Sequence, residues 1–305
     1  MLNDNLKSYL HLHFIVFIWG FTAVLGALIS LNALPLVWFR MTLALGFMFI
    51  YICYKKFSLR VRLKTVIGFL FAGLIIALHW LTFFKAIKVS NISITLACLS
   101  TGAFFASLLE PILKRRKIIW YEVFFSIIVV VGLGIIFRVE GDYLEGIILG
   151  LTSAFLSALF SVVNSNYAKK YNASIISFYE ILGGVTFLSI FLLFNHNFNI
   201  AFFTISINDW IYLAILSSFC TAYAFIASVK VMKFLSPYTV MLTINLEPIY
   251  GIILAVIIFQ EKERMKFEFY IGAILILSTV ILNGIVKYYK KPNVEIENND
   301  ELAVK

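Results

Sequence analysis

The stretch LPLVWFRMTLALGFMFIYIC, residues 34–53, is long enough to cross a membrane as a helix and carries one charge, Arg40. About 20 apolar residues in a helix span the roughly 30 Å hydrocarbon core of a bilayer. Similar stretches recur along the chain, which is 62% hydrophobic and only 13% charged. A globule of 305 residues has no interior large enough to bury so much apolar surface, so the predicted solvent is lipid.

Apolar stretches between charged positions divide the chain into ten predicted transmembrane segments. We expect helices because isolated segments in lipid must satisfy their own backbone hydrogen bonds, and the alternating pattern of a barrel strand is missing. The first segment follows a single basic residue, Lys7, and is expected to stay as an anchor instead of being cleaved as a signal peptide. The predicted spans are 10–30, 34–53, 64–84, 90–113, 118–137, 147–167, 174–194, 209–228, 236–259 and 268–288.

Lysine and arginine residues divide unequally between the two sides of this arrangement. With a cytoplasmic N-terminus, 18 of them lie inside and 6 outside, while Arg40 remains within a span. Cytoplasmic loops of membrane proteins carry such an excess. We therefore expect a multi-pass protein of the plasma (inner) membrane with both termini in the cytoplasm. The net charge of +9 follows from this topology and implies no nucleic-acid partner.

The two halves of the chain resemble each other at a fixed offset. KAIKVSN at 85–91 is similar to KVMKFLS at 230–236, 145 residues later, and Glu122 corresponds to Glu268. Because each half holds five spans, an odd number, the second half enters the membrane in the opposite sense. The predicted fold is therefore an all-α integral membrane protein of ten transmembrane helices, arranged as two inverted five-helix repeats like those of many secondary transporters. The predicted units are a first repeat at 1–137, an external loop at 138–146, a second repeat at 147–290 and a disordered acidic cytoplasmic tail at 291–305.

Several short motifs accompany this repeat: Trp19-Gly20, Pro35 followed by Arg40, the segment Ala86 to Lys88, and LEPIYGIILAVIIFQEKE at 246–263. Together with the ten spans they resemble the EamA-type drug/metabolite transporters over about residues 10–288. The resemblance implies a carrier of small metabolites, often outward, whose inner helices surround a central cavity while spans 5 and 10 stand to one side. The first half departs from the pattern, because Gly102 stands where the second half has Pro248 and KRRK at 114–117 replaces the acidic turn at 260–263.

Ionisable side chains at membrane depth are candidate functional groups, because burying them in lipid costs several kcal/mol unless they are paired or hydrated. Arg40 and Glu247 are predicted at similar depths and are expected to share one polar cluster, either as a structural pair or as part of a solute site. Glu180, the counterpart of Arg40 in the second half, is expected roughly 12 Å from it in depth.

Four further residues complete the predicted cavity. His79, beside Trp80, is either a proton shuttle or solute donor, or an interior group bonded to a backbone carbonyl. Trp19, near the midplane, either stacks on an apolar solute or packs within the protein. Asn245 completes hydrogen bonds in the cavity or bonds a neighbouring helix. The predicted substrate-binding residues are Trp19, Arg40, His79, Trp80, Glu180, Asn245 and Glu247.

Motifs of other function classes are missing. The sequence has no nucleophile–base motif, no pair of histidines four apart on one helix and no phosphate-binding loop, so we expect neither an enzyme nor an ATP-driven pump. Its three cysteines show no paired spacing, and we expect no cofactor and no metal. The favoured function is a secondary transporter (permease) that moves a small organic metabolite, such as an amino acid or amphipathic compound, by alternating access. The export direction follows from the resemblance alone, and coupling to protons and the oligomeric state are left open. The alternative function is that of a membrane channel or membrane-embedded sensor without carrier activity.

Overall fold

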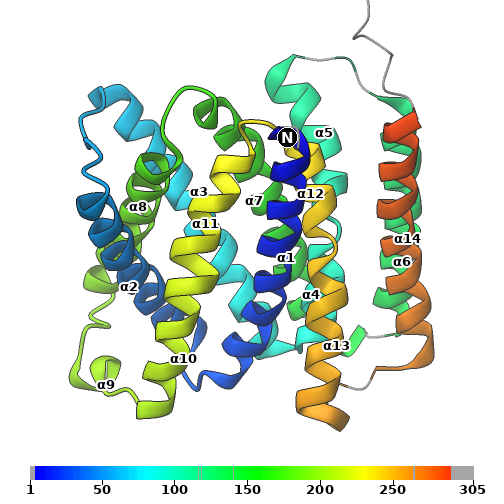
Figure 1. The fold of residues 1–305 in the computed structure, drawn as a ribbon. Coiled ribbons are helices and arrows are strands. Elements are labelled where there is room, and N and C mark those ends of the chain that lie inside the picture. Colours follow the sequence, from blue (N-terminus) through cyan, green and yellow to red (C-terminus); the bar gives the residue numbers. More distant parts are fainter. Residues whose placement is uncertain (1–3, 116, 118, 140, 264, 290–305) are drawn as a thin grey trace, which may run out of the picture.

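A computed structural model of the chain describes residues 4–115, 117, 119–139, 141–263 and 265–289. This described part is helical and contains no strand (Figure 1). The predicted tail at 291–305 lies outside the described residues. The elements are α1 (Asp4–Leu28), α2 (Ala33–Tyr54), α3 (Leu63–Val89), α4 (Ile92–Leu99), α5 (Gly102–Lys114), α6 (Trp120–Val139), η1 (Gly141–Tyr143), α7 (Leu144–Ala168), α8 (Ala173–Phe194), α9 (Ile200–Phe203), α10 (Ile207–Ser217), η2 (Ser218–Tyr223), α11 (Ala224–Val231), α12 (Pro237–Ile244), α13 (Glu247–Phe259), η3 (Gln260–Glu263) and α14 (Phe267–Tyr289).

Eight helical segments of the described chain are long and apolar enough to cross a membrane. Three of them are composite, because α4 continues into α5, α10 into α11 through the π-helical turn η2, and α12 into α13. The predicted fifth and tenth spans coincide with α6 and α14, in which the apolar stretches found among the described residues are shorter, Val123–Ile136 and Phe267–Thr279. Within the described residues, eight of the ten predicted spans therefore meet the length and hydropathy expected of a transmembrane helix.

Helices α6 and α14 lie side by side at one edge of the bundle, where the family resemblance places spans 5 and 10 (Figure 1). Their backbones approach closely at two glycines. A Cβ on Gly272 would lie 2.8 Å from the carbonyl oxygen of Gly132, and a Cβ on Gly132 would lie 2.7 Å from the Ile276 side chain. Small residues permit such contacts between membrane helices.

In the described part of the chain, the break between α4 and α5 in the first half has an equivalent in the second half, the break between α12 and α13. α4 and α12 have eight residues each, α5 and α13 have thirteen each, and the members of each pair start 145 residues apart, the offset of the predicted repeat. The last residues of the two similar heptapeptides are the caps that start α4 and α12. Asn91 Oδ1 accepts a hydrogen bond from the Ile94 amide at 2.9 Å, and Ser236 Oγ accepts one from the Thr239 amide at 3.2 Å.

Different residues interrupt the two helices, each of which is a single span in the sequence-based prediction. In the first half, the hydroxyls of Ser100 and Thr101 donate to the carbonyl oxygens of Ala97 and Cys98 at 2.6 and 2.7 Å. Such bonds compete with the helical pattern. In the second half, Pro248 has no amide hydrogen for a helical bond and is accommodated in the first turn of α13.

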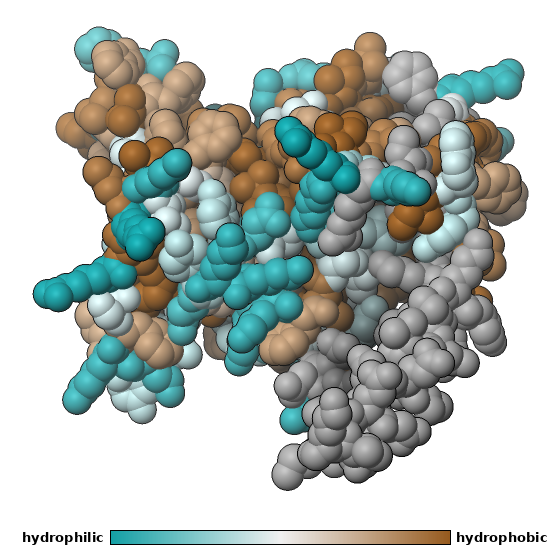
Figure 2. All heavy atoms as spheres, turned by 90° about the horizontal axis from the view of Figure 1, so that it is seen from above, coloured by the Kyte–Doolittle hydropathy of each residue, from teal (hydrophilic) through white to brown (hydrophobic). Residues whose placement is uncertain are grey.

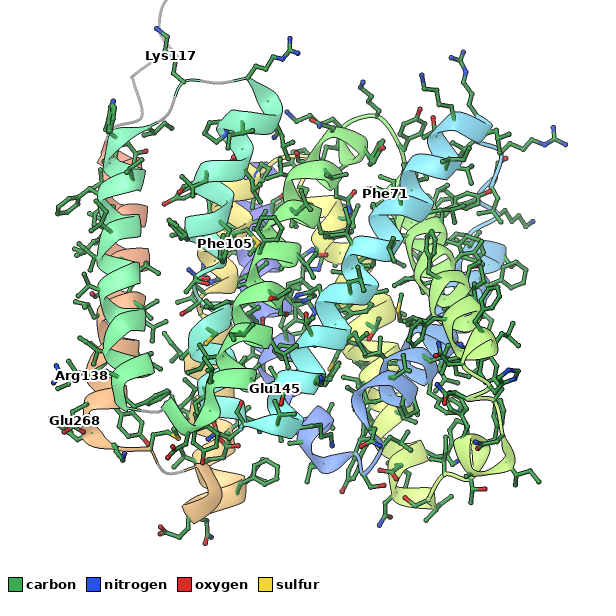
Figure 3. The ribbon with its side chains drawn as sticks, turned by 180° about the vertical axis from the view of Figure 1, so that it is seen from behind. Phe71, Phe105, Lys117, Arg138, Glu145 and Glu268 are labelled. Atoms are coloured by element: carbon green, nitrogen blue, oxygen red, sulfur yellow. The ribbon has the colours of Figure 1, made fainter. Side chains whose placement is uncertain are left out.

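The outer wall and the ends of the bundle differ in character. Large apolar side chains cover the wall, and Phe71, which points away from the bundle in Figure 3, is 59% exposed. Hydrophilic side chains gather at the end seen in Figure 2, to which Lys117 belongs, whereas Arg138 and Glu145 lie towards the opposite end (Figure 3). The former end is the one for which the charge count predicts a cytoplasmic location.

Candidate functional site

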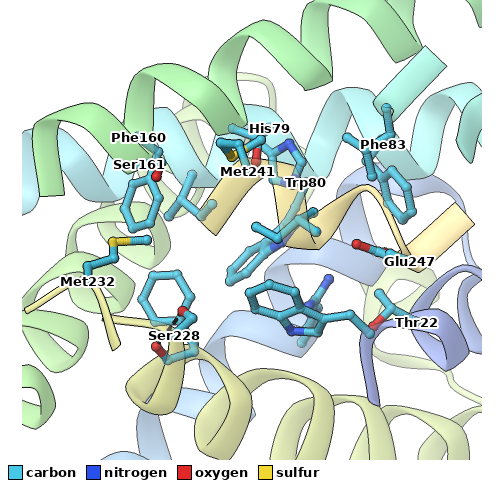
Figure 4. Close-up of a pocket in the computed structure, with 17 residues that line it drawn as sticks. Thr22, His79, Trp80, Phe83, Phe160, Ser161, Ser228, Met232, Met241 and Glu247 are labelled. Atoms are coloured by element: carbon cyan, nitrogen blue, oxygen red, sulfur yellow. Dashed lines mark hydrogen bonds between the residues drawn. The ribbon is translucent and has the colours of Figure 1, made fainter. Parts of the chain in front are cut away.

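A cavity lies between helices of both halves (Figure 4). The first half contributes side chains from α1, α2, α3 and α4, and the second half from α7, α11, α12 and α13. Most of the lining is apolar or aromatic, including Trp80, Phe83, Phe160, Phe225, Met232 and Met241.

Trp19 reaches the cavity from α1, and its neighbour Gly20 lets α1 pack tightly on α13. A Cβ on Gly20 would lie 2.7 Å from the Cβ of Tyr250. The indole Nε1 of Trp19 donates to the carbonyl oxygen of Cys220, in η2, at 3.1 Å. This bond satisfies the polar end of the indole and leaves the ring as part of the cavity wall.

Arg40 enters the cavity from α2 and is only 1% exposed. Its Nε donates to Thr221 Oγ1, also in η2, at 2.7 Å. The guanidinium carbon lies 4.1 Å from the centre of the Trp80 ring and 5.3 Å from that of Phe84, so cation–π attraction adds to the hydrogen bond. Among the described residues, Arg40 Nη1 has no hydrogen-bond partner. The arginine is thus held in place with one donor unused.

Glu247, the first residue of α13, lines the same cavity (Figure 4). Within the described part of the chain, no salt bridge joins it to Arg40. The two residues expected to form one polar cluster therefore share a cavity without direct pairing. The break before α13 explains how Glu247 is tolerated, because a carboxylate at a helix N-terminus interacts favourably with the helix dipole.

His79 combines a structural bond with a place in the cavity wall. Its Nδ1 donates to the carbonyl oxygen of Ser153 on α7 at 2.9 Å, and Ser153 Oγ donates to the carbonyl oxygen of His79 at 3.0 Å. His79 is therefore bonded to a backbone carbonyl, which is one of the two roles predicted for it. His79 and its neighbour Trp80 both line the cavity.

Two of the seven predicted residues lie outside the residues that line the cavity. Glu180, on α8, is fully buried, and its Oε2 accepts a hydrogen bond from Asn164 Nδ2 at 3.2 Å. Asn245 is 1% exposed at the break between α12 and α13. Neither its Oδ1 nor its Nδ2 has a hydrogen-bond partner among the described residues.

Sequence reasoning missed most of the apolar lining and the polar anchor in η2. The apolar residues gave no signal, because a side chain facing a cavity and one facing lipid have the same character. Ser157 and Ser161, four residues apart on α7, did carry a signal, since this spacing places two hydroxyls on one helix face. The missed residues are Thr22, Ile76, Phe83, Leu99, Ser157, Phe160, Ser161, Thr221, Phe225, Ser228, Met232, Met241 and Ile244.

The sequence profile of the EamA-like transporter family matches residues 6–138 and 144–285, which covers both halves. The chain belongs to the EamA-like transporter family. The resemblance to drug/metabolite transporters is thereby confirmed, and this EamA-like protein is a multi-pass membrane protein of a family of transporters, not enzymes. No curated protein matches its sequence. One solved structure, described only as a crystal structure of a protein, is 13% identical, with a TM-score of 0.69 over 93% of this chain and 99% of that chain, and shares the fold.

The cavity of the EamA-like chain offers few but distinct polar groups. A guanidinium with an unused donor and a carboxylate lie in one compartment, with serine and threonine hydroxyls and aromatic rings around them. Among the described residues, no three metal-ligating side chains come together. The arrangement is suited to binding an organic molecule that has both charged and apolar parts.

Proposed function

We propose that the protein is a secondary transporter that carries a small organic metabolite across the plasma membrane by alternating access, with export as its direction. The observation that carries the proposal is a cavity lined by both halves, in which Arg40 and Glu247 form no ion pair with each other. Inverted repeats that exchange conformations open such a cavity to either side in turn. The export direction is supported by the family resemblance alone.

The solute class follows from the charges in the cavity. An amino acid or similar amphipathic compound places its carboxylate against the free Nη1 of Arg40 and its ammonium group against Glu247. Its apolar part then lies against Trp19, Trp80 and Phe225. Hydrogen bonds to charged groups contribute about 1.5–3 kcal/mol each. A zwitterion makes both bonds, so it should bind more tightly than a solute that makes only one of them.

The test is flux of labelled amino acids, nucleosides and amphipathic cations into liposomes that contain the purified protein. Arg40→Ala and Glu247→Gln should each weaken zwitterion transport about ten- to a hundredfold, the loss expected for one charged hydrogen bond. Arg40→Lys should not restore it, because an ammonium group cannot reproduce both the bond to Thr221 and the stacking on Trp80.

A matched control separates the cavity from general effects of charge. Glu145→Gln removes an exposed carboxylate on α7 that pairs with Lys85 at 3.0 Å, and transport should be unchanged. In cells, overproduction should lower the internal level of the transported solute and raise tolerance to a toxic analogue. Ion currents at channel-like rates, or no flux of any solute in the panel, would favour a channel or sensor and contradict the transporter proposal.

A further inference from the structure

A second polar cluster, made of Ser161, Asn164, Ser177 and Glu180, lies between α7 and α8. All four side chains are at most 1% exposed. The only hydrogen bond between two of these side chains runs from Asn164 Nδ2 to Glu180 Oε2, at 3.2 Å. Four oxygen atoms have no partner among the described residues, namely Glu180 Oε1, Asn164 Oδ1, Ser161 Oγ and Ser177 Oγ.

The helix register places these four residues at two matching levels of α7 and α8. α7 ends at Ala168 and α8 starts at Ala173, so the two helices form a hairpin with a short turn. Asn164 and Ser177 each lie four residues from the turn, and Ser161 and Glu180 each lie seven, about 10 Å from it. The cluster thus has two layers, one helical turn apart, and the bond between Asn164 and Glu180 joins them diagonally.

No positive charge in the described residues compensates Glu180. On the helices packed against α8, Arg40 of α2 bonds Thr221 and His79 of α3 bonds Ser153. The lysines of α3 lie near its ends, and Lys230 of α11 is exposed. Glu180 interacts electrostatically with the Tyr167 hydroxyl on α7, but this group carries no positive charge that could compensate the carboxylate.

An uncompensated carboxylate at membrane depth costs several kcal/mol, and a bound cation removes that cost. We propose that Ser161, Asn164, Ser177 and Glu180 form a site for a small monovalent cation, H⁺ or Na⁺, that adjoins the solute pocket and drives transport. This role rests on the proposed transport function. A carboxylate surrounded by amide and hydroxyl oxygens is a ligand set for a hard cation, and the same carboxylate accepts a proton.

The cluster adjoins the cavity through Ser161, which lines the cavity as well (Figure 4). Glu180 also lies where α8 of the second half packs closely on α3 of the first half. A Cβ on Gly73 of α3 would lie 1.9 Å from the carbonyl oxygen of Glu180, and one on Gly183 would lie 2.5 Å from that of Leu70. Neutralising Glu180 therefore changes the charge beside a contact between the two halves.

The test is infrared difference spectroscopy of the full-length protein in liposomes, which detects the C=O stretch of protonated carboxyl groups. The protein is titrated from about pH 5 to about pH 9, in choline chloride and in NaCl. A band that is lost with rising pH identifies a proton site, and a band that Na⁺ removes at constant pH identifies a sodium site. In either case the change should be absent from Glu180→Gln and present in Glu247→Gln and in the exposed control Glu145→Gln.

Two milder variants keep the carboxylate, so they test the site even if Glu180→Gln does not fold. Asn164→Ala and Ser177→Ala should shift the midpoint for H⁺ or Na⁺ about two- to tenfold, the effect of one hydrogen bond or ligand. No band change with pH or Na⁺, or a change lost in Glu247→Gln and kept in Glu180→Gln, would overturn the proposal. The infrared measurement needs no solute, so its result tests the cation site independently of the transport assay.

Discussion

Glu263 joins the two halves of the protein at the N-terminus of α4, and its removal should be costly. Glu263 is 5% exposed in η3, which follows α13 of the second half. Its carboxylate accepts hydrogen bonds from the Ile92 amide at 2.9 Å, the Ser93 amide at 3.0 Å and the Ser93 hydroxyl at 2.9 Å. The acidic turn at 260–263 therefore has a structural role, because it satisfies amides that a helix N-terminus leaves unpaired.

The size of the effect follows from these three bonds. Glu263→Ala leaves the two buried amides of α4 without an acceptor, and each buried unsatisfied donor costs about 1–3 kcal/mol. The Ser93 hydroxyl can rotate to another acceptor, so we count only the amides and expect a loss of about 2–6 kcal/mol. In a protein of this size such a loss lowers the midpoint of thermal unfolding by roughly 3–9 °C.

Thermal unfolding of the purified protein in detergent measures this loss. Glu145→Ala is the control, because it removes an exposed carboxylate whose ion pair with Lys85 contributes at most about 1 kcal/mol. Glu263→Gln keeps one acceptor oxygen and should lie between Glu263→Ala and the wild type. If Glu263→Ala is no less stable than Glu145→Ala, the interpretation of this contact as a helix cap that joins the halves is refuted.

Three further outcomes are expected. In a background without the native cysteines, a cysteine in place of Asp142 should react with an impermeant thiol reagent from outside. A cysteine in place of Lys170 should react only after permeabilisation, and the reverse pattern would contradict the topology. Gly73→Ala should lower stability by at least about 3 kcal/mol or prevent folding, because the added Cβ meets a backbone carbonyl. The control Gly46→Ala, whose Cβ meets no atom within 4 Å, should raise stability by about 0.5–1 kcal/mol. Equal unfolding midpoints would argue against the close crossing of α3 and α8. Thr221→Val should lower stability by about 1.5–3 kcal/mol in the same assay, because Arg40 Nε loses its acceptor, and Thr221→Ser should not.

Much of the architecture was predictable because lipid restricts the possible structures. A long apolar segment must be helical there, whatever it packs against, so the eight spans follow from composition and length. The repeat was predictable for a different reason. The matched heptapeptides end at Asn91 and Ser236, which cap the two equivalent short helices, so a local capping requirement keeps a visible trace in both halves.

The candidate site was predictable only in part. Depth along a helix follows from residue number, and depth was enough to single out Trp19, Arg40, His79 and Glu247, all of which line the cavity. Depth did not separate these residues from Glu180, which faces Asn164 instead. Glu180 differs from these four residues in the direction in which its side chain points around the helix axis.

Tertiary structure decides that rotation for a physical reason. In water, the polar face of a helix shows which side is buried, but in lipid both the outer wall and the cavity wall are apolar. Phe71 and Phe160 are thus alike in sequence, yet Phe71 lies on the exposed wall and Phe160 lines the cavity. The sequence by itself determined the helices, their repeat and the depth of each charge. Only the packing of α1, α3, α7, α8 and α13 at close backbone contacts decided which side chains meet in the cavity and which form the cluster around Glu180.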